Sequence, residues 1–285
     1  MNKFRFPSVL IFFFSFLSIH SVCQTANDLV ESGKVKFKDK NYHGAIDDYN
    51  AALQIDSTFA IAYFKRGMSY YNLQNYNAAL TDFNQYISMK PNDDNGYYNR
   101  AMCWKQMEKP EYCITDLKKV LEIDSSNTNA LLKLGNVYYE ANDFKQAIVE
   151  FTLYIKIKPD VSGGYYNRGN AYQKLKMVDS AVADFSKAII TNNDFEQAYV
   201  NRGSLFNQLG YYDQALLDFQ SALTLKPADT DALLNRGVAY HNLHQEDNAC
   251  IDWKYAASYG QAEATGYFSK YCQGGYKLTS SLHTP

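Results

Sequence analysis

The sequence repeats itself with a period of 34 residues over most of its length. Residues 163–193 read GGYYNRGNAYQKLKMVDSAVADFSKAIITNN, and the stretch from residue 197 has nearly the same order of small, apolar and polar residues. The period continues without a gap when the chain is divided at residues 26, 60, 94, 128, 162, 196 and 230. Such a period is typical of a repeat protein, in which each repeat packs on its neighbours.

Three places in the repeat keep their character, and each repeat reads as two short amphipathic helices joined by a polar turn. The eighth place is small: Gly33, Gly67, Ala101, Gly135, Gly169, Gly203 and Gly237. The twentieth is Ala45, Ala79, Cys113, Ala147, Ala181, Ala215 and Ala249. The twenty-fourth is large: Tyr49, Phe83, Leu117, Phe151, Phe185, Phe219 and Trp253.

The recurring glycine predicts a close approach of two helices. A glycine inside a helix costs about 0.5–1 kcal/mol relative to alanine, so its recurrence at one place needs a compensating contact. We expect the eighth place to face the twentieth, and the twenty-fourth to fill the gap against the next repeat.

These residues resemble the tetratricopeptide repeat family over residues 26–263. The resemblance implies an all-α solenoid, a right-handed superhelix of helix pairs with a concave inner face. The seven expected repeats are 26–59, 60–93, 94–127, 128–161, 162–195, 196–229 and 230–263. We expect Gly260 to end a helix, a capping helix to follow at residues 264–273, and a flexible tail at 274–285.

Residues 1–23 are predicted to be a secretory signal peptide and not part of the fold. A short positive start precedes an apolar run over residues 9–17, VLIFFFSFL, which is too short for a good membrane span. Ser21 and Cys23 then supply small residues at the positions that precede cleavage before Gln24.

The alternative reading makes Cys23 the lipidated first residue of an anchored lipoprotein. His20 and Val22 are poor residues to precede such a cysteine, so simple cleavage is favoured. Both readings predict an exported bacterial protein, periplasmic or extracellular.

The composition and motifs argue against nucleic-acid binding and catalysis. The formal net charge is −2, and no basic stripe is present of the kind that nucleic-acid binding needs. No G-x-S-x-G, P-loop or dinucleotide glycine pattern occurs. His241 and His244 lie near a helix end without a Cys or Glu at zinc spacing, and we interpret them as surface residues. We therefore predict no enzyme activity, no cofactor and no metal.

Four cysteines remain after Cys23, and an exported protein can form disulfides. Cys250 lies ten residues before Gly260 and Cys272 twelve after it, so a helical hairpin that turns at Gly260 brings them nearly level. We predict a Cys250–Cys272 disulfide that holds the capping helix, with two buried thiols as the alternative. Cys103 and Cys113 are interpreted as small buried hydrophobic residues.

The sixth place of the first helix provides the candidate binding residues. It reads Glu31, Lys65, Asn99, Lys133, Asn167, Asn201 and Asn235. Asparagine is a poor helix former, so three in succession favour a function. The row resembles the asparagine ladder of the tetratricopeptide superhelix in the glycosyltransferase that attaches N-acetylglucosamine to Ser and Thr, where amides hold an extended peptide backbone. Ordinary polarity of a helix surface is the alternative explanation.

Aromatic residues beside this row are candidates for apolar pockets. They are Phe64, Tyr98 and Tyr166 at the fifth place and Tyr71 and Tyr139 at the twelfth. Lys65, Asn99 and Lys133 partly resemble the clamp with which some tetratricopeptide domains hold acidic C-termini. Lysine is missing from the second place (Ile61, Asn95, Asn129), which puts that activity in doubt.

A second row pairs arginine at the seventh place with an acid at the twenty-third. The arginines are Arg66, Arg100, Arg168, Arg202 and Arg236. Because the seventh place flanks the core stripe, ion pairs between packed helices are favoured over an anion site. The sequence leaves open whether each acid belongs to the same repeat or to the preceding one.

The sequence thus predicts a scaffold in the bacterial cell envelope. It would bind an extended peptide or a partner helix of another protein in the concave groove. The alternative is a purely structural assembly component that uses convex-face contacts and has no groove ligand.

Overall fold

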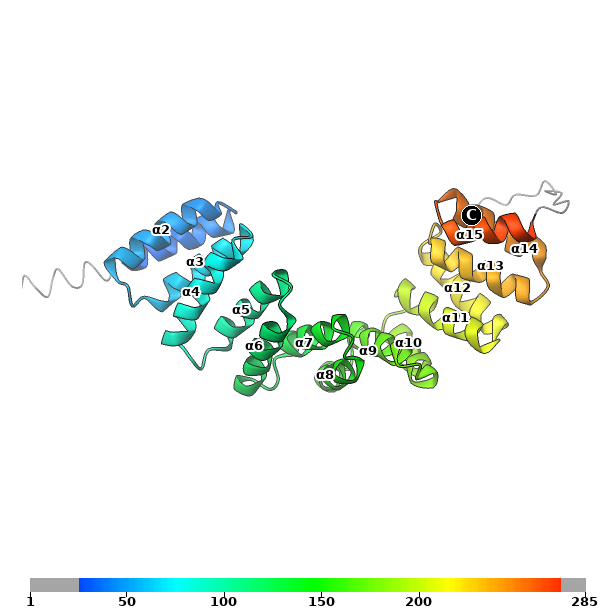
Figure 1. Cartoon of the computed structure of the whole chain (residues 1–285), viewed down its shortest axis with the longest axis horizontal. Helices are drawn as coiled ribbons and strands as arrows, with labels where there is room; N and C mark the ends of the chain where they lie inside the picture. The colour runs from blue at the N-terminus through cyan, green and yellow to red at the C-terminus, as the bar shows by residue number, and fades with distance from the viewer. Residues whose placement is uncertain (1–25, 273–285) are drawn as a thin grey trace, which may run out of the picture. The chain divides into compact units, whose positions relative to one another are not determined.

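The computed structural model describes residues 26–272, which are helical and contain no strand (Figure 1). They divide into two compact blocks, and the boundary in the sequence lies between Val137 and Tyr138. The all-α repeat architecture is confirmed, whereas the superhelix over the whole chain stays a prediction. The predicted signal peptide, with its Cys23, and the predicted tail at 274–285 lie outside the described residues. No described helix has both the length and the apolar character needed to cross a membrane.

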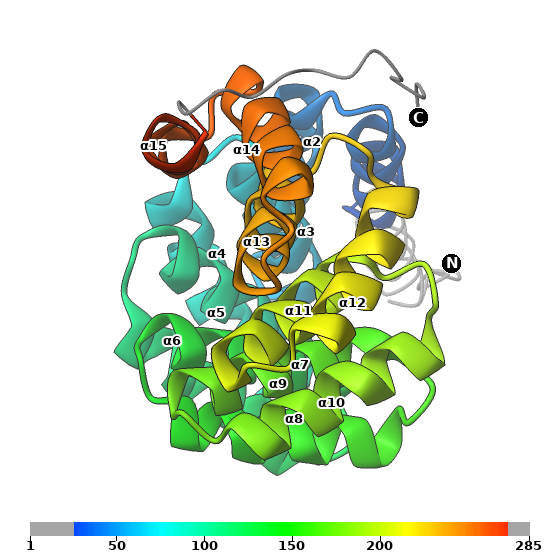
Figure 2. The same cartoon turned by 90° about the vertical axis from the view of Figure 1, so that its right-hand side faces the viewer.

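Each repeat places a 13- or 14-residue first helix against a second helix of similar length. The N-terminal block holds a helix over residues 26–38, α2 (Tyr42–Ile55), α3 (Ala60–Asn72), α4 (Tyr76–Met89), α5 (Asp94–Gln106), α6 (Pro110–Ile123) and most of α7 (Thr128–Glu140). The C-terminal block continues with α8 (Phe144–Ile157), α9 (Ser162–Lys174), α10 (Val178–Thr191), α11 (Glu196–Leu209), α12 (Tyr212–Leu225), α13 (Thr230–Asn242), α14 (Glu246–Ser258) and α15 (Ala262–Tyr271). Within this block α13 and α14 lie side by side (Figures 1 and 2).

The turn inside each repeat places its fifteenth residue in the left-handed region. These residues are Lys40, Gln74, Glu108, Asn142, Lys176, Gly210 and His244, with φ between 55° and 80°. In the second repeat the N–H of Asn75 donates to the carbonyl of Tyr70, and that of Gln74 to Tyr71. These bonds satisfy carbonyls at the end of the first helix and terminate it.

The glycine of the eighth place makes room for the aromatic ring of its own repeat. A Cβ on Gly169 would lie 2.8 Å from Cε1 of Phe185, and one on Gly203 would lie 2.9 Å from Cε1 of Phe219. We expected this ring to fill the gap against the next repeat and the twentieth place to face the glycine, but the nearest atoms to the glycine are those of the ring in its own repeat. The glycine therefore lets the second helix insert a ring against the backbone of the first.

The third place, which the sequence analysis did not single out, mediates close packing between repeats. A Cβ on Gly96 would lie 2.8 Å from Ile87 and from Tyr86 of the preceding repeat, and one on Gly164 would lie 2.8 Å from Tyr154. Four other repeats have a fully buried alanine at this place, Ala62, Ala130, Ala198 and Ala232, whereas Asp28 of the first repeat is exposed.

Each seventh-place arginine joins its own repeat to the preceding one. Arg202 donates from Nε and Nη2 to the carboxylate of Asp218 at 2.8 and 2.6 Å, and from Nη1 to Ser186 Oγ at 2.9 Å. Arg66, Arg100, Arg168 and Arg236 repeat this arrangement, with Asn50, Asn84, Thr152 and Gln220 in the role of Ser186. The acid thus belongs to the same repeat, which resolves the pairing that the sequence left open.

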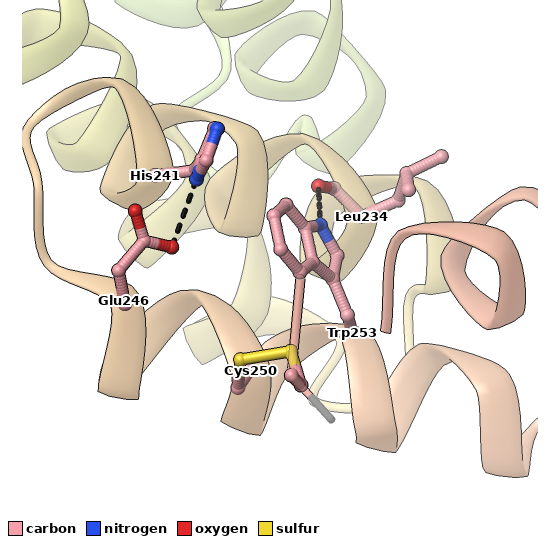
Figure 3. The surroundings of a disulfide bond; sticks show 6 residues. Leu234, His241, Glu246, Cys250 and Trp253 are labelled. Carbon is pink, nitrogen blue, oxygen red and sulfur yellow. Dashed lines mark hydrogen bonds and ion pairs between the residues drawn. A yellow bond between two sulfur atoms is a disulfide. The ribbon is translucent and has the colours of Figure 1, made fainter. Parts of the chain in front are cut away.

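Helix α15 covers the end of the C-terminal block. It begins at Ala262, not at residue 264 as expected, and Gly260 precedes it in the left-handed conformation. Cys250 of α14 and Cys272 form a disulfide (Figure 3). Cys103 and Cys113 are buried and are not disulfide-bonded.

The disulfide lies beside an aromatic cluster. Trp253 is fully buried, and its indole N–H donates to the carbonyl of Leu234 at 3.2 Å (Figure 3). Its ring stacks on Tyr267 of α15. His241 was interpreted as a surface residue, but its ring packs 4.5 Å from that of Tyr271 and its Nδ1 contacts Glu246 at 2.8 Å. His241 is therefore part of the contact between α13 and the cap.

Candidate functional site

The sixth-place asparagines lie on the first helices of their repeats and are half-buried. Asn99 is on α5 of the N-terminal block, and Asn167, Asn201 and Asn235 follow on α9, α11 and α13 of the C-terminal block. Their spacing along the chain is regular, but their hydrogen bonds differ from one another.

Two of these asparagines fold back on their own helices. The side-chain amide of Asn99 donates to the carbonyl of Asn95 at 2.8 Å, and that of Asn235 donates to Asp231 at 2.8 Å. The backbone carbonyl of Asn235 also accepts a 2.8 Å bond from the side chain of Asn207. Such bonds one turn back occupy an amide donor that a ligand would otherwise use.

Asn201 instead connects two first helices. Its side-chain nitrogen donates to Oδ1 of Asn170 at 2.9 Å and to the hydroxyl of Tyr166 at 3.3 Å, and both partners lie on α9. We call Tyr166, Asn170 and Asn201 the Asn201 cluster. Asn170 was not named as a site residue from the sequence, although its ninth place lies on the same side of the helical wheel as the sixth.

The Asn201 cluster keeps hydrogen-bonding capacity for a ligand. An asparagine amide has two donor hydrogens and a carbonyl acceptor. The cluster uses the donors of Asn201 and the acceptor of Asn170. Within the described residues, the carbonyl oxygen of Asn201 and the amide nitrogen of Asn170 have no hydrogen-bond partner. The cluster thus offers one acceptor and one donor group on adjacent helices.

The predicted aromatic residues divide into core and half-buried groups. Phe64 is only 9% exposed and packs against Phe83 and Tyr86, so it belongs to the core and not to an open pocket. Tyr71, Tyr98, Tyr139 and Tyr166 are half-buried. The ring of Tyr166 lies 4.7 Å from that of Phe195, which fixes the hydroxyl that Asn201 contacts.

Burial keeps three of these tyrosine hydroxyls protonated. It raises the pKa of Tyr71, Tyr98 and Tyr139 above the ordinary value near 10, since desolvation disfavours the phenolate. At neutral pH each hydroxyl is therefore a neutral donor and acceptor beside the sixth-place row.

The predicted cationic residues lie in the N-terminal block. Lys65 on α3 is half-buried, with Nζ 5.5 Å from the centre of the Phe64 ring. Burial, and then the nearby Lys34, lower the pKa of Lys65. Lys133 on α7 is also half-buried. The sixth place is thus cationic on α3 and α7 and a neutral amide on α9, α11 and α13.

Family comparisons identify the repeat. A family model described as TPR repeat matches residues 33–74 and 203–243. Three models described as tetratricopeptide repeat match residues 60–93, 129–160 and 163–195, so that the matches together cover more than half of the chain. The chain is a tetratricopeptide repeat protein.

Solved structures with this tetratricopeptide fold align over most of their length. The C-terminal part of a TPR repeat-containing protein from Cytophaga hutchinsonii is 17% identical, with a TM-score of 0.73 and coverage of 83% of this chain and 98% of that one. A tetratricopeptide repeat protein from Parabacteroides merdae is 16% identical, with a TM-score of 0.61 and coverage of 86% and 98%. YrrB, described as a TPR protein with an unusual peptide-binding site, is 24% identical, with a TM-score of 0.57 and coverage of 66% and 97%. These similarities show the fold, and no curated protein matches the sequence.

Two other kinds of site were compared with the predicted residues. Among residues 26–272, no three His, Cys, Asp or Glu side chains are grouped so that they could hold a metal ion. An open depression at the turn between α4 and α5 is lined by residues 89–94 and by none of the predicted site residues. The repeat fold is that of a typical interaction scaffold, and the Asn201 cluster is its best-defined polar site.

Proposed function

We propose that this protein binds an extended peptide segment of a partner protein along the inner face of its first helices, with the Asn201 cluster at the centre. The observation that carries the proposal is the free acceptor of Asn201 beside the free donor of Asn170. A peptide main chain presents one N–H and one C=O per residue, which are the complements of these two groups.

The chemistry of the C-terminal block favours main-chain recognition. Its sixth-place residues Asn167, Asn201 and Asn235 are uncharged, so they select no charge in the ligand. Tyr139 and Tyr166 lie on neighbouring first helices and supply apolar rings for the side chains of the ligand. YrrB, a tetratricopeptide protein described as having an unusual peptide-binding site, supports this proposal by analogy.

In the N-terminal block the proposed face includes Lys65 and Lys133 with Asn99 between them in sequence. No carboxylate among the described residues pairs with Lys65. These residues would attract a carboxylate on the bound segment, and we include them in the proposed face as its cationic part.

The proposed location is outside the cytoplasm, in the bacterial envelope. It rests on residues 1–23, whose short positive start and apolar run are typical of an export signal. Mass spectrometry of the mature protein from its native source tests this. A chain that starts at Gln24 indicates simple cleavage, a lipid-modified Cys23 indicates an anchored lipoprotein, and an intact Met1 contradicts export.

Partner capture tests the binding face. Affinity capture from native envelope extract, followed by mass spectrometry, would identify the partner, and its binding segment would then be mapped with overlapping peptides. We expect Asn170→Ala with Asn201→Ala to weaken peptide binding about tenfold or more, because each lost hydrogen bond is worth about 1 kcal/mol. Asn248→Ala, an exposed residue of α14, is the matched control and should bind normally.

A second outcome would favour the alternative function. If a variant with Asn167, Asn201 and Asn235 all changed to alanine captures the same partner with unchanged affinity and melts normally, the inner face is not the binding site. The convex face would then be responsible, as expected of a purely structural assembly component.

A further inference from the structure

The outward face of α8 differs from that of the other second helices. Val149, Leu153 and Ile157 follow one another at intervals of four residues and are 49%, 45% and 40% exposed. This spacing places them in one stripe along the helix. In α2, α4, α6, α10 and α12 the same repeat places include at least one polar residue: Asp47, Thr81, Thr115, Lys187 and Ser221, respectively.

Helix α14 and its C-cap residue Tyr259 carry the only other uninterrupted outward stripe among the described second helices. Its members are Ile251, Tyr255 and Tyr259, and the two tyrosines are 44% and 58% exposed. They occupy the same three repeat places as the α8 stripe, so both stripes run in the same way along equivalent helices. Exposed apolar stripes of this kind mark interaction sites.

The charges beside the two stripes are opposite. The exposed lysines on and just after α8, Lys145, Lys156 and Lys158, outnumber the exposed acids at its two ends, Asp143 and Asp160. The one acid within the helix, Glu150, is only 9% exposed. Helix α14 begins with the exposed acids Glu246 and Asp247, and Lys254 is its exposed base. The lysines at the end of α8 are therefore attracted to the acidic start of α14, whereas two copies of the net-positive α8 have no such complementary charge.

We propose that copies of this protein associate head to tail, with the α8 stripe of one copy packed antiparallel on the α14 stripe of the next. This orientation pairs Leu153 with Tyr255 at the centre, with Val149 opposite Tyr259 and Ile157 opposite Ile251. It also brings Lys156 and Lys158 towards Glu246 and Asp247. The negative end of one helix macrodipole then meets the positive end of the other, which adds to the attraction.

The association joins two different patches, so each dimer keeps one free patch at either end. Such heterologous contacts produce open chains, or rings where the geometry closes. The stripes are short compared with a standard protein interface, so we expect weak association that depends on concentration.

Sedimentation velocity of the chain without residues 1–23, from about 1 to about 500 µM, measures this association. We expect the weight-average sedimentation coefficient of the wild type to rise with concentration. Leu153→Asp and Tyr255→Asp should each abolish the rise, because each variant loses one patch. Ser221→Asp changes the equivalent outward residue of α12 and should associate like the wild type. Circular dichroism melts would exclude unfolding of any variant.

An equimolar mixture of the two variants gives the decisive result. The intact α14 of Leu153→Asp can bind the intact α8 of Tyr255→Asp, so the mixture should form dimers and nothing larger. A monomeric wild type at the highest concentration, or a mixture that stays monomeric, would overturn the proposal. The same holds if Tyr255→Asp alone associates like the wild type. Binding of monomers to anionic lipid vesicles that is lost with Leu153→Asp would assign the stripe to a membrane surface instead.

Discussion

The eighth and twenty-fourth places act as one packing unit. Six repeats combine glycine with an aromatic residue, and the third repeat combines Ala101 with Leu117. Since a ring of the second helix lies against the glycine backbone, a methyl group at the eighth place is tolerated where the ring is replaced by a smaller side chain. The exception therefore follows the same packing rule as the six glycines.

This packing predicts opposite effects on stability for substitutions of two glycines of α9. Gly169→Leu should lower the free energy of unfolding by at least about 1–3 kcal/mol, because Phe185 fills the space that the new side chain needs. Gly163→Ala is the control, because no atom lies within 4 Å of the added methyl group, and it should raise stability by about 0.5–1 kcal/mol. Chemical denaturation measures both, and a Gly169→Leu variant as stable as the wild type would contradict the ring contact.

Two carboxyl groups meet at the start of α11. Glu196 is 7% exposed and lies close to Asp229, the N-cap of α13. Burial, and then the charge of Asp229, raise the pKa of Glu196. Ionised Glu196 is therefore less favourable in the folded protein than in the unfolded chain.

The proximity of Glu196 and Asp229 predicts that Glu196→Gln increases the stability of the protein by an amount that depends on pH. In the wild type, ionisation of Glu196 lowers the free energy of unfolding. This loss is absent below the pKa of Glu196 in the unfolded chain, about 4.3, and it grows as the pH rises through the higher pKa in the folded protein. Glutamine keeps the size and can donate to Asp229, so the variant should melt at a higher temperature at pH 7. The difference should vanish near pH 4. Thermal melts across this range check it, and a variant that is less stable than the wild type at pH 7 would show that the ionised pair is not unfavourable.

Sequence reasoning located the important residues better than it described their contacts. A helical wheel shows on which side of the helix Gly169 lies, but not how far the Phe185 ring reaches. The nearest neighbour of the glycine was therefore predicted wrongly. Likewise, equal spacing made Asn201 and Asn235 look equivalent. Only coordinates show that Asn235 bonds to its own helix while Asn201 reaches across to α9.

At the scale of elements, the period was sufficient to predict two helices per repeat, and the cap shows where it stops being sufficient. The turn before α15 is shorter than the turns between repeats, so α15 begins at Ala262 and Ala264 becomes its buried residue. The 34-residue period alone does not predict this shorter turn. The disulfide between Cys250 and Cys272 was still predicted correctly, because the prediction used the distance of each cysteine from the turn at Gly260 and not the repeat period.

The disulfide should contribute strongly to the stability of the cap. Cys250 and Cys272 close a loop with a sequence separation of 22, so replacing both by serine should cost about 3 kcal/mol. We expect faster amide hydrogen exchange in α15 and at its contact with α14. The melting temperature of the wild type should fall with reductant, and that of the double variant should not change. Identical melting of the wild type with and without reductant would contradict this role.

At the scale of the whole molecule, contacts between repeats are local. The core consists of separate clusters, such as the one around Phe83 in the N-terminal block and the one around Trp253 in the C-terminal block. In a repeat array the stability is approximately a sum over repeats and their nearest-neighbour contacts. The resemblance to a known family was enough to predict this organisation from the sequence.

Local coupling predicts that damage to one block stays within it. Phe83 is fully buried, and Phe83→Ala should cost about 3–5 kcal/mol. Amide hydrogen exchange should become faster in α3, α4 and α5 and remain unchanged in α11 to α13. Equal acceleration in both blocks would indicate cooperative unfolding of the whole chain.

The arginine bridges have a consequence for how such a chain can grow. Each arginine bonds to the carboxylate of its own repeat in the same way. Its bond to the preceding repeat instead ends on a side-chain oxygen that varies: Asn50, Asn84, Thr152, Ser186 or Gln220. The bridge therefore requires of the preceding repeat only an uncharged side chain with an acceptor oxygen. Where both neighbours carry these residues, a duplicated or deleted repeat would meet a compatible bridge at either end, whereas the fourth repeat has Leu134 in place of the arginine. Elsewhere, array length can therefore change in evolution or by engineering without redesign of the adjoining surfaces.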